Sequence, residues 1–269
     1  MGTSDIPVMI LCGGKGTRIR DVSDIVPKPM LPIGDHPILW HIMRRYYGYG
    51  FRRFILCLGH MGDQIRDYFL EYNLKKQDVT VQFNGASRAS DHTFHSTSND
   101  RDLHWAVTLA ETGRDNMTGS RVAQALRYVD TPYFMLTYGD GLGDIDLKAL
   151  ESFHDQGSQK ITITGVRPAA RFGKLVIEGD RVTNFSEKPQ TQGEYISGGY
   201  MCVDTDLIRE YLTADPGQIL EVNGLPQMAE DRKMGVYKHH DFWMPMDTPT
   251  EFSYLNDLWA KGQAPWKNW

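Results

Sequence analysis

The chain places a glycine-rich, positively charged loop directly after its first apolar segment. Residues 7–12 (PVMILC) form an uninterrupted apolar run, and residues 13–18 (GGKGTR) follow without a spacer. Such a run is typical of a strand that is buried on both faces, as in a parallel sheet covered by helices. Glycines after such a strand let backbone N–H groups approach phosphate oxygens, because no Cβ atom obstructs them. The segment therefore predicts an α/β fold that binds a phosphorylated ligand.

The glycine spacing differs from two common phosphate-binding motifs. A P-loop requires G-x-x-x-x-G-K-[ST], which this loop lacks, and a dinucleotide-binding fingerprint requires a third glycine where Ile19 stands. A tight turn without a ligand is the alternative. The cations Lys15, Arg18 and Arg20, followed by Lys28 in a proline-rich segment, favour an anion-binding loop.

The charge distribution supports a small anionic ligand in the N-terminal part of the chain. The first 60 residues contain eight Lys and Arg against four Asp, a local excess of four positive charges, whereas the 269-residue chain has a net charge of −5. A solvated basic surface is the alternative explanation of this excess. The overall negative charge argues against extended nucleic-acid binding, so we expect no nucleic-acid partner.

Composition and cysteine usage are typical of a globular cytoplasmic protein. The chain is 41% hydrophobic and 23% charged, and no apolar run approaches the ~18 residues that a membrane span requires. The N-terminal segment lacks the features of a signal peptide. Cys12, Cys57 and Cys202 are odd in number and lie far apart in apolar runs, so we expect buried free thiols. We therefore expect a cytoplasmic location and no membrane partner.

Strand-like and helix-like patterns alternate, which predicts an α/β fold with a mostly parallel sheet flanked by helices. The expected strands cover residues 7–12, 54–58, 79–83, 106–110, 133–138, 161–167, 174–177, 182–186 and 198–204. The expected helices cover residues 38–49, 62–72, 118–128, 146–155, 205–213, 219–231 and 249–261. The turn-forming residues 178–181 (EGDR) between two strand-like runs indicate a small antiparallel hairpin.

The pattern indicates a single domain. No internal repeat or linker divides the sequence, so we expect one domain over residues 1–269. Residues 84–104 are polar, rich in Ser, Asp and His, and too weakly apolar to pack against a core. We expect them to form a long surface loop.

Two N-terminal segments resemble the signature of the sugar-1-phosphate nucleotidyltransferases. They are residues 11–18 (LCGGKGTR) and 27–39 (PKPMLPIGDHPIL). Further matching segments continue in register at residues 37–43, 112–121, 137–141, 171–173, 187–189, 245–248 and 264–267. Trp40 and His41, the stretch MTGSR at residues 117–121 and the terminal APWK are similar to the cytidylyl branch of this family.

This resemblance implies a Rossmann-like, mostly parallel central sheet of the nucleotide-diphospho-sugar transferase type. It assigns residues 7–150 to a nucleotide-binding half, and residues 151–269 to an acceptor-binding half with the C-terminal helices. The implied reaction transfers a cytidylyl group from CTP to a sugar 1-phosphate, above all glucose 1-phosphate, giving CDP-glucose and pyrophosphate. Both reactants are anions, so the protein must neutralise and orient charge rather than supply a nucleophile. Relatives assemble as homo-oligomers, and we expect the same here.

The resemblance assigns the catalytic chemistry to a few charged side chains. Arg18 would bind β- and γ-phosphate oxygens, and Lys28, kept extended rather than helical by its flanking prolines, would stabilise charge at the α-phosphate. Asp140 and Asp247 would hold Mg²⁺, which prefers hard oxygen ligands. From local sequence alone, Lys28 is a surface lysine, Asp140 a turn residue and Asp247 a helix N-cap.

The two substrate sites draw on the glycine loop and on later motifs. The expected nucleotide-binding residues are Leu11, Cys12, Gly13, Gly14, Lys15, Gly16, Thr17, Arg18, Thr112, Gly113, Arg121 and Gly139. The expected acceptor-binding residues are Tyr138, Glu187, Lys188, Gly198 and Gly199. By resemblance, Arg121 helps to recognise cytosine, in its own or a neighbouring subunit's site. From local sequence alone, Glu187 and Lys188 are an exposed ion pair.

The acceptor region departs from the family pattern. Ser197 stands where the family has Asn, residues 221–226 (EVNGLP) replace a Glu-x-x-Pro-Leu stretch, and Ser120 replaces a glycine. A shorter side chain at position 197 changes the hydrogen bonds available to a sugar hydroxyl, and such contacts discriminate strongly between acceptors. Three functions stay open: cytidylyl transfer to glucose 1-phosphate, cytidylyl or other nucleotidyl transfer to another phosphorylated acceptor, and a catalytically silent nucleotide-sugar-binding regulator.

Overall fold

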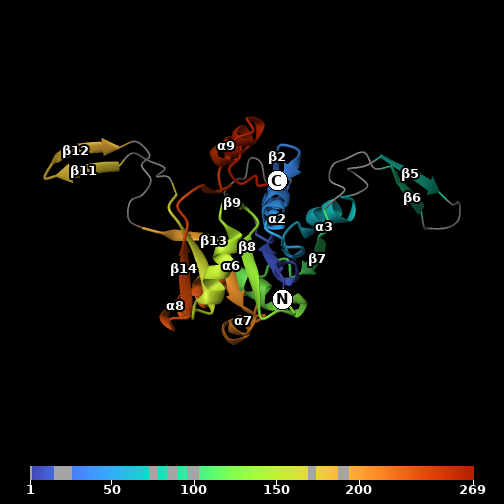
Figure 1. Ribbon diagram of the computed structural model, residues 1–269, viewed down its shortest axis with the longest axis horizontal. Helices are drawn as coiled ribbons and strands as arrows, with labels where there is room; N and C mark the ends of the chain where they lie inside the picture. Colours follow the sequence, from blue (N-terminus) through green and yellow to red (C-terminus); the bar gives the residue numbers. More distant parts are fainter. Residues whose placement is uncertain are drawn as a thin grey trace.

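A seven-stranded mixed sheet forms the centre of the molecule (Figure 1). The computed structural model describes residues 2–14, 26–72, 78–83, 90–95, 103–168, 174–186 and 194–269. In spatial order the strands are β14 (Met234–Lys238), β10 (Ile161–Val166), β13 (Ile196–Asp204), β8 (Tyr133–Tyr138), β1 (Pro7–Leu11), β4 (Arg53–Leu58) and β7 (Ala106–Glu111). β1 pairs in parallel with both β4 and β8, whereas β13 is antiparallel to β8 and β10. The mostly parallel α/β class predicted from the sequence is therefore confirmed.

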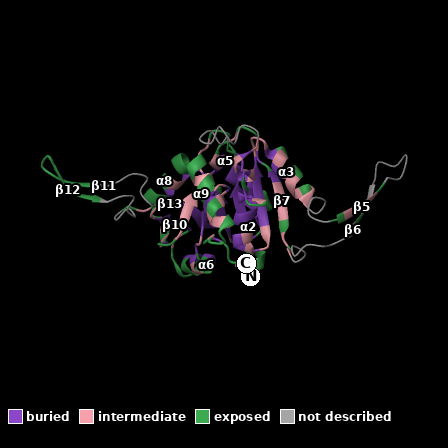
Figure 2. Cartoon of the chain, turned by 90° about the horizontal axis from the view of Figure 1, so that it is seen from above, coloured by how far each residue is buried: buried purple, intermediate pink, exposed green. Residues whose placement is uncertain are grey.

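Helices cover both faces of this sheet, because successive side chains of each strand point to opposite sides. Val8 and Ile10 of β1 belong to one hydrophobic core, and Met9 and Leu11 belong to the other. The helices of the first core are α2 (Ile38–Gly48), α3 (Gly62–Leu70), α6 (Leu147–Gln156) and α9 (Pro249–Ala260). Those of the second core are α5 (Thr118–Ala125), α7 (Thr205–Tyr211) and α8 (Leu225–Glu230). Figure 2 shows the buried strands between these layers.

Short elements connect and extend this framework. Two-stranded pairs are β2 (Pro32–Ile33) with β3 (His36–Pro37), β5 (Asp78–Phe83) with β6 (Ser90–His95), β9 (Gly141–Gly143) with β15 (Trp243–Pro245), and β11 (Lys174–Glu178) with β12 (Arg181–Ser186). The 3₁₀ turns are η1 (Thr3–Asp5), η2 (Lys28–Met30) and η4 (Leu126–Tyr128), and η5 (Leu220–Gly224) is π-helical. The hairpins β5–β6 and β11–β12 lie at the two ends of the long axis in Figure 1.

The short strands β2, β3, β9 and β15 were not predicted, and three longer segments also differ from the sequence-based prediction. The predicted loop over residues 84–104 is wrong for residues 90–95, which form the strand β6 by antiparallel backbone pairing with β5. The helix predicted over 219–231 begins as the π-helical η5, and α8 starts only at Leu225, next to Pro226 in the first turn. Strand β14 was not predicted, because its residues are half-buried or exposed and contain no continuous apolar run.

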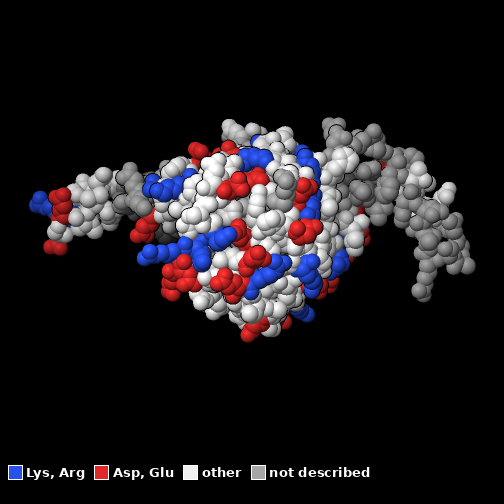
Figure 3. All heavy atoms as spheres, turned by 60° about the horizontal axis from the view of Figure 1, so that its bottom comes forward, with Lys and Arg blue, Asp and Glu red and all other residues white. Residues whose placement is uncertain are grey.

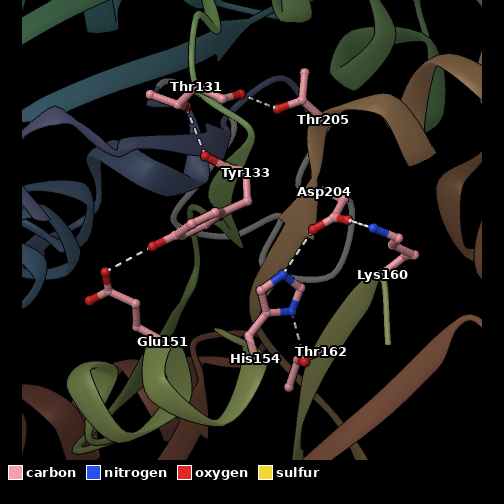
Figure 4. A network of polar contacts seen from close by, with 8 residues as sticks. All are labelled: Thr131, Tyr133, Glu151, His154, Lys160, Thr162, Asp204 and Thr205. Carbon is pink, nitrogen blue, oxygen red and sulfur yellow. Dashed lines mark hydrogen bonds and ion pairs between the residues drawn. The ribbon is translucent and has the colours of Figure 1, made fainter. Parts of the chain in front are cut away.

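A polar network fixes α6 at the end of the sheet where β8 begins (Figure 4). The buried imidazole of His154 lies 3.0 Å from Thr162 Oγ1 through Nδ1 and 3.1 Å from Asp204 Oδ1 through Nε2. Lys160 Nζ donates to the second oxygen of Asp204 at 2.6 Å. Buried polar groups need such partners to offset the loss of water. The network thus anchors the edge of the sheet opposite to the carboxyl end of β8.

Charges of both signs are interspersed on the face shown in Figure 3. Surface ion pairs such as Arg53 with Asp130 and Arg209 with Asp206, each at 2.7 Å, link neighbouring charges. A nucleic-acid-binding face is instead typically dominated by positive charge. Separately, among the helices that the structure describes, none combines the length and the apolar character needed to cross a membrane.

The C-terminal tail returns to the first core and encloses His41 of α2. Trp266 is fully buried, and the indole of Trp259 packs edge-on against the His41 ring with 4.6 Å between centroids. His41 Nε2 lies 2.9 Å from the carbonyl oxygen of Ile33, and Trp266 Nε1 donates to His41 Nδ1 at 3.4 Å. The ring therefore carries its proton on Nε2 and is held neutral. Burial lowers the pKa of His41 from the ordinary 6.5 to about 4.

This neutral histidine should make stability depend on pH. Between pH 6.5 and 4 the unfolded chain binds a proton that the folded chain excludes, so the free energy of unfolding falls as the pH falls. From pH 7 to pH 5 we expect His41 to contribute a loss of about 2 kcal/mol. Urea denaturation of the wild type and His41→Gln at both pH values measures this contribution. Equal losses in the two proteins would contradict the prediction.

Candidate active site

A cavity of about 500 Å³ opens at the carboxyl ends of β1 and β8. Ligand sites of α/β sheets lie at this edge, where loops after neighbouring parallel strands diverge. The lining residues are Leu11, Cys12, Gly13, Gly14, Lys28, Pro29, Arg114, Asp115, Asn116, Met117, Thr118, Arg121, Tyr138, Gly139, Asp140 and Asp247. Four parts of the chain thus meet around one space: the turn after β1, the start of α5, the end of β8 and Asp247, which precedes the N-cap of α9.

Arg121 of α5 forms part of the cavity wall between two glycines. A Cβ atom at Gly13 would lie 2.3 Å from the guanidinium, and one at Gly59 would lie 2.2 Å from it. These two positions therefore require glycine as long as Arg121 keeps this place. Burial of the guanidinium lowers the pKa of Arg121.

Four hydrogen bonds hold Arg121 against the surrounding segments of the chain. Its Nη1 donates to the carbonyl of Leu58 at 2.7 Å and to Thr112 Oγ1 at 3.1 Å. Its Nη2 donates to the carbonyls of Gly13 at 3.2 Å and Arg114 at 3.3 Å. The residue thus joins the turn after β1, the end of β4 and the loop before α5 into one wall of the cavity.

Lys28 lies between two carboxylates at the floor of the cavity. Its Nζ is 2.6 Å from Asp140 Oδ2 and also forms a short ion pair with Asp247. The lysine side chain is 11% exposed. Burial by itself would lower the pKa of Lys28, because it disfavours the charged ammonium. The two carboxylates have the larger effect in the opposite direction, so the pKa of Lys28 is raised. The ammonium is therefore a permanent cation within this triad.

The backbone at Lys28 differs from the sequence-based expectation. Lys28 begins the 3₁₀ turn η2 rather than an extended segment, and the preceding Pro27 is extended, with φ −63° and ψ 142°. Pro29 at the second position of the turn needs no hydrogen-bond acceptor, because it has no N–H. The proline-flanked motif therefore fixes Lys28 at the start of a turn.

Asp140 and Asp247 are held side by side by backbone pairing. Asp140 follows β8 and Asp247 precedes α9, and the Met246 N–H donates to the Asp140 carbonyl at 2.8 Å. The pairing continues from there into β9 and β15. Thr248, in a capping box with Glu251, is the N-cap of α9, so the Asp247 carboxylate is directed to Lys28 instead. Two adjacent hard oxygen donors fit a divalent cation such as Mg²⁺ if phosphate oxygens and water complete its coordination.

A recess of about 50 Å³ adjoins the cavity and shares Tyr138 and Asp140 with it. Gly198 and Gly199 of β13 line this recess. Gly199 has φ +73°, and a Cβ atom there would lie 2.9 Å from the Tyr138 ring, so only glycine fits. Tyr200 follows with φ +36°, an uncommon conformation for a bulky residue. This irregular stretch of β13, where its register with β10 shifts, thus lies against the Tyr138 ring.

Several predicted site residues come together and others do not. Ten of them line the cavity: Leu11, Cys12, Gly13, Gly14, Lys28, Arg121, Tyr138, Gly139, Asp140 and Asp247. Gly198 and Gly199 line the recess. Thr112 and Gly113 do not line either space, although Thr112 accepts a hydrogen bond from Arg121. Lys15, Gly16, Thr17, Arg18, Glu187 and Lys188 lie outside the described residues.

Sequence reasoning missed three residues around these spaces. Glu221 accepts hydrogen bonds from Thr118 and Tyr138, and Trp243 Nε1 donates to the Gly198 carbonyl at 2.8 Å. Asn116 lines the cavity and donates to the Thr112 carbonyl at 2.9 Å. Glu221 lies in the segment 221–226 that departs from the family pattern, but no local pattern gives the partners of these three residues, because the partners come from distant parts of the chain or from the backbone.

The comparisons with known proteins agree with this geometry. The nucleotidyl transferase family model matches residues 7–256. The glucose-1-phosphate cytidylyltransferase of Salmonella typhi is 39% identical over 268 residues, covering 97% of this chain and 98% of the relative. A protein of Bacillus subtilis named probable glucose-1-phosphate cytidylyltransferase is 38% identical, covering 97% and 99%. The structure of HddC from Yersinia pseudotuberculosis in complex with GMP-PN shares the fold, with a TM-score of 0.66 and 22% identity over 94% of this chain and 99% of that one.

These matches extend along nearly the whole chain and include the turn after β1, the end of β8 and the start of α9. Enzymes of this family act on a nucleotide and a sugar phosphate, and they generally use a divalent metal ion. A cavity at the carboxyl ends of β1 and β8 with one cation between two carboxylates suits this chemistry. The chain therefore belongs to the nucleotidyl transferase family and is a nucleotidyltransferase.

Proposed function

We propose that this enzyme transfers a cytidylyl group from CTP to glucose 1-phosphate, giving CDP-glucose and pyrophosphate. The observation that carries the proposal is the triad of Lys28, Asp140 and Asp247 at the floor of the cavity, where Asp140 also lines the recess. The names of the relatives from Salmonella typhi and Bacillus subtilis support CTP and glucose 1-phosphate as the substrates. In this proposal CTP occupies the larger cavity and the sugar 1-phosphate occupies the recess.

The reaction needs positioning and charge neutralisation more than covalent catalysis. An oxygen of the sugar phosphate attacks the α-phosphorus of CTP, a new P–O bond forms, and the bond to the β-phosphate oxygen breaks to release pyrophosphate. Lys28 would bind an α-phosphate oxygen and stabilise the charge that develops there. When bound, a magnesium ion would neutralise phosphate charge and help to orient the two reactants. Asp140 and Asp247 are the proposed ligands of that ion.

Further residues complete the proposed sites by resemblance to the family. Lys15, Gly16, Thr17 and Arg18 would bind the triphosphate, and Glu187 and Lys188 would bind the acceptor. Tyr138 and the backbone at Gly198 and Gly199 would contact the sugar. Arg121 would act indirectly, since its Nη groups already donate to four oxygens of its own chain and thereby shape the cavity wall.

A second candidate is nucleotidyl transfer to a different phosphorylated acceptor. The Ser197 hydroxyl accepts a long hydrogen bond from the Gly199 N–H at 3.4 Å and stands where the family has the longer Asn. The hydroxyl of Ser197 cannot offer a sugar hydroxyl the same polar contact as the longer Asn amide. This difference alters how strongly the enzyme discriminates between acceptors. A catalytically silent regulator is disfavoured, because nothing in such a role requires the Lys28 triad.

Pyrophosphate release with four nucleoside triphosphates and a panel of sugar and polyol phosphates, in the presence of Mg²⁺, tests both candidates. We expect turnover with CTP and glucose 1-phosphate and little with the other pairs. Turnover of CTP with another acceptor would select the second candidate. No turnover with any pair would refute nucleotidyl transfer by this chain.

We also propose a cytoplasmic homo-oligomer. Five apolar side chains of the β11–β12 hairpin are 44–59% exposed: Leu175, Val176, Ile177, Val182 and Phe185. Exposed apolar groups of this kind are typical of surfaces that bind another protein. The described cysteines are buried free thiols, which suits a reducing compartment. Analytical ultracentrifugation would distinguish an oligomer from a monomer.

A further inference from the structure

Glu221 links the two walls of the site, and the proposed mechanism gives it no role. Its Oε2 accepts a hydrogen bond from Thr118 Oγ1 at 2.6 Å, and its Oε1 accepts a short hydrogen bond from the hydroxyl of Tyr138. Thr118 Oγ1 in turn accepts from the Leu220 N–H at 2.9 Å. Thr118 begins α5 and lines the larger cavity, whereas Tyr138 ends β8 and lines both the cavity and the recess. One carboxylate therefore connects the two substrate spaces.

Tyr138, like Asp140, lines both spaces, and Glu221 accepts a hydrogen bond from the hydroxyl end of its ring. Gly199 fits closely against the same ring, since a Cβ atom there would lie 2.9 Å from it. Burial, together with the neighbouring Glu221 carboxylate, raises the pKa of Tyr138, so the phenol stays protonated and donates. A tyrosine has only two side-chain torsions, so fixing its hydroxyl and one ring edge fixes the plane of the ring.

The local backbone presents Glu221 in an unusual way. It lies on η5, a π-helical segment that immediately precedes α8. Single π-helical turns occur frequently at functional sites, where they redirect a side chain. Glu221 is exposed at the rim, so its two hydrogen bonds form in competition with water rather than through burial. An exposed carboxylate beside a site for two anionic substrates repels those substrates. Its presence there is therefore explained best if it holds a neighbouring side chain in place.

We propose that Glu221 is a positioning residue that holds the Tyr138 ring as the partition between the nucleotide cavity and the acceptor recess. This inference rests on the proposed function, since it assigns the acceptor to the recess. Loss of the carboxylate frees the ring to rotate, which disturbs the acceptor pocket first and leaves the phosphate-binding triad in place. The effect therefore falls on the KM for the acceptor.

The test compares steady-state kinetics of Glu221→Ala, Glu221→Gln, Tyr138→Phe and the double variant Glu221→Ala with Tyr138→Phe. For Glu221→Ala we expect the acceptor KM to rise about tenfold, while kcat and the KM for CTP change less than about threefold. Glu221→Gln should recover most of this loss, because the amide oxygen accepts from Tyr138 and the amide N–H donates to Thr118. The matched control is Glu230→Ala, an exposed glutamate on α8, which should behave as the wild type.

The double variant decides whether Glu221 acts through Tyr138. If it does, Glu221→Ala adds no further increase in the acceptor KM once the Tyr138 hydroxyl is absent. Independent, multiplicative effects would overturn the inference, as would an unchanged acceptor KM in Glu221→Ala with an active wild type. Absence of turnover by the wild type with every substrate pair would instead refute the proposed function, and the inference with it. Tyr138→Phe removes only one oxygen, so it tests the partition even if Glu221→Ala fails to fold.

Discussion

Replacing Lys28 with alanine is expected to lower kcat by about 10³-fold and to leave the chain folded. The proposed reaction builds charge on the α-phosphate, and removal of a single preorganised donor from such a position costs about 10²–10³-fold in other enzymes. Lys28 is also the cation between Asp140 and Asp247, so its loss leaves two carboxylates facing each other without a counter-charge. Both effects lower turnover, and we therefore expect a loss at the upper end of this range.

Pyrophosphate release measures the loss, and circular dichroism with thermal unfolding checks the fold. Lys261→Ala is the matched control, because Lys261 is an exposed lysine at the end of α9. Lys28→Arg separates charge from shape, since it keeps the positive charge but replaces a compact ammonium with a planar fork. A Lys28→Ala variant with near-normal kcat would eliminate the role assigned to this residue.

Asp247→Ala is expected to lower kcat by about 10²-fold or more and to raise the Mg²⁺ concentration required for half-maximal rate. Asp247 is one of two carboxylates at the floor of the cavity, and capping of α9 falls to Thr248, so removal of its side chain should not unfold the helix. Loss of one of two oxygen donors weakens the hold on a divalent cation. The variant should therefore be folded and poorly active.

A Mg²⁺ titration of the rate, at saturating CTP and acceptor, distinguishes a ligand from a merely structural residue. Asp247→Asn keeps the shape and one oxygen donor, and it should lie between the wild type and Asp247→Ala. Asp257→Ala, an exposed aspartate on the same helix, should leave the titration unchanged. An Asp247→Ala variant with the wild-type Mg²⁺ dependence would argue that Asp247 serves only to pair with Lys28.

Much of the fold is predictable from sequence because the central strands are continuous apolar runs. β1 is buried along its whole length, and β8 over its four central residues, since helices cover both faces of the sheet. β14 lies at the edge of the sheet, and Val236 within it is 42% exposed. An edge strand is partly exposed to water and needs no continuous apolar run. The backbone hydrogen bonds to β10 therefore define β14 instead. Apolar patterning therefore predicts the interior of this sheet better than its margins.

The site is less predictable, because its parts meet only through the folded backbone. Asp247 by itself has the sequence context of a helix N-cap, yet Thr248 caps the helix and Asp247 pairs with Lys28. The link between Glu221 and Tyr138 joins residues 83 positions apart, and no spacing rule connects them. The glycine at position 59 is explained only by the guanidinium that packs against it.

The hydrogen bond from the Met246 N–H to the Asp140 carbonyl joins parts of the chain that are synthesised far apart in time. The proposed active site is therefore completed late in translation. The second carboxylate of the triad is synthesised 219 residues after Lys28, which takes about 10–40 s at ordinary elongation rates. A nascent chain that has completed β9 already carries Lys28 and Asp140, but β9 still lacks its partner β15. The proposed catalytic triad is complete only when α9 begins, so an incomplete chain released from the ribosome before that point lacks Asp247.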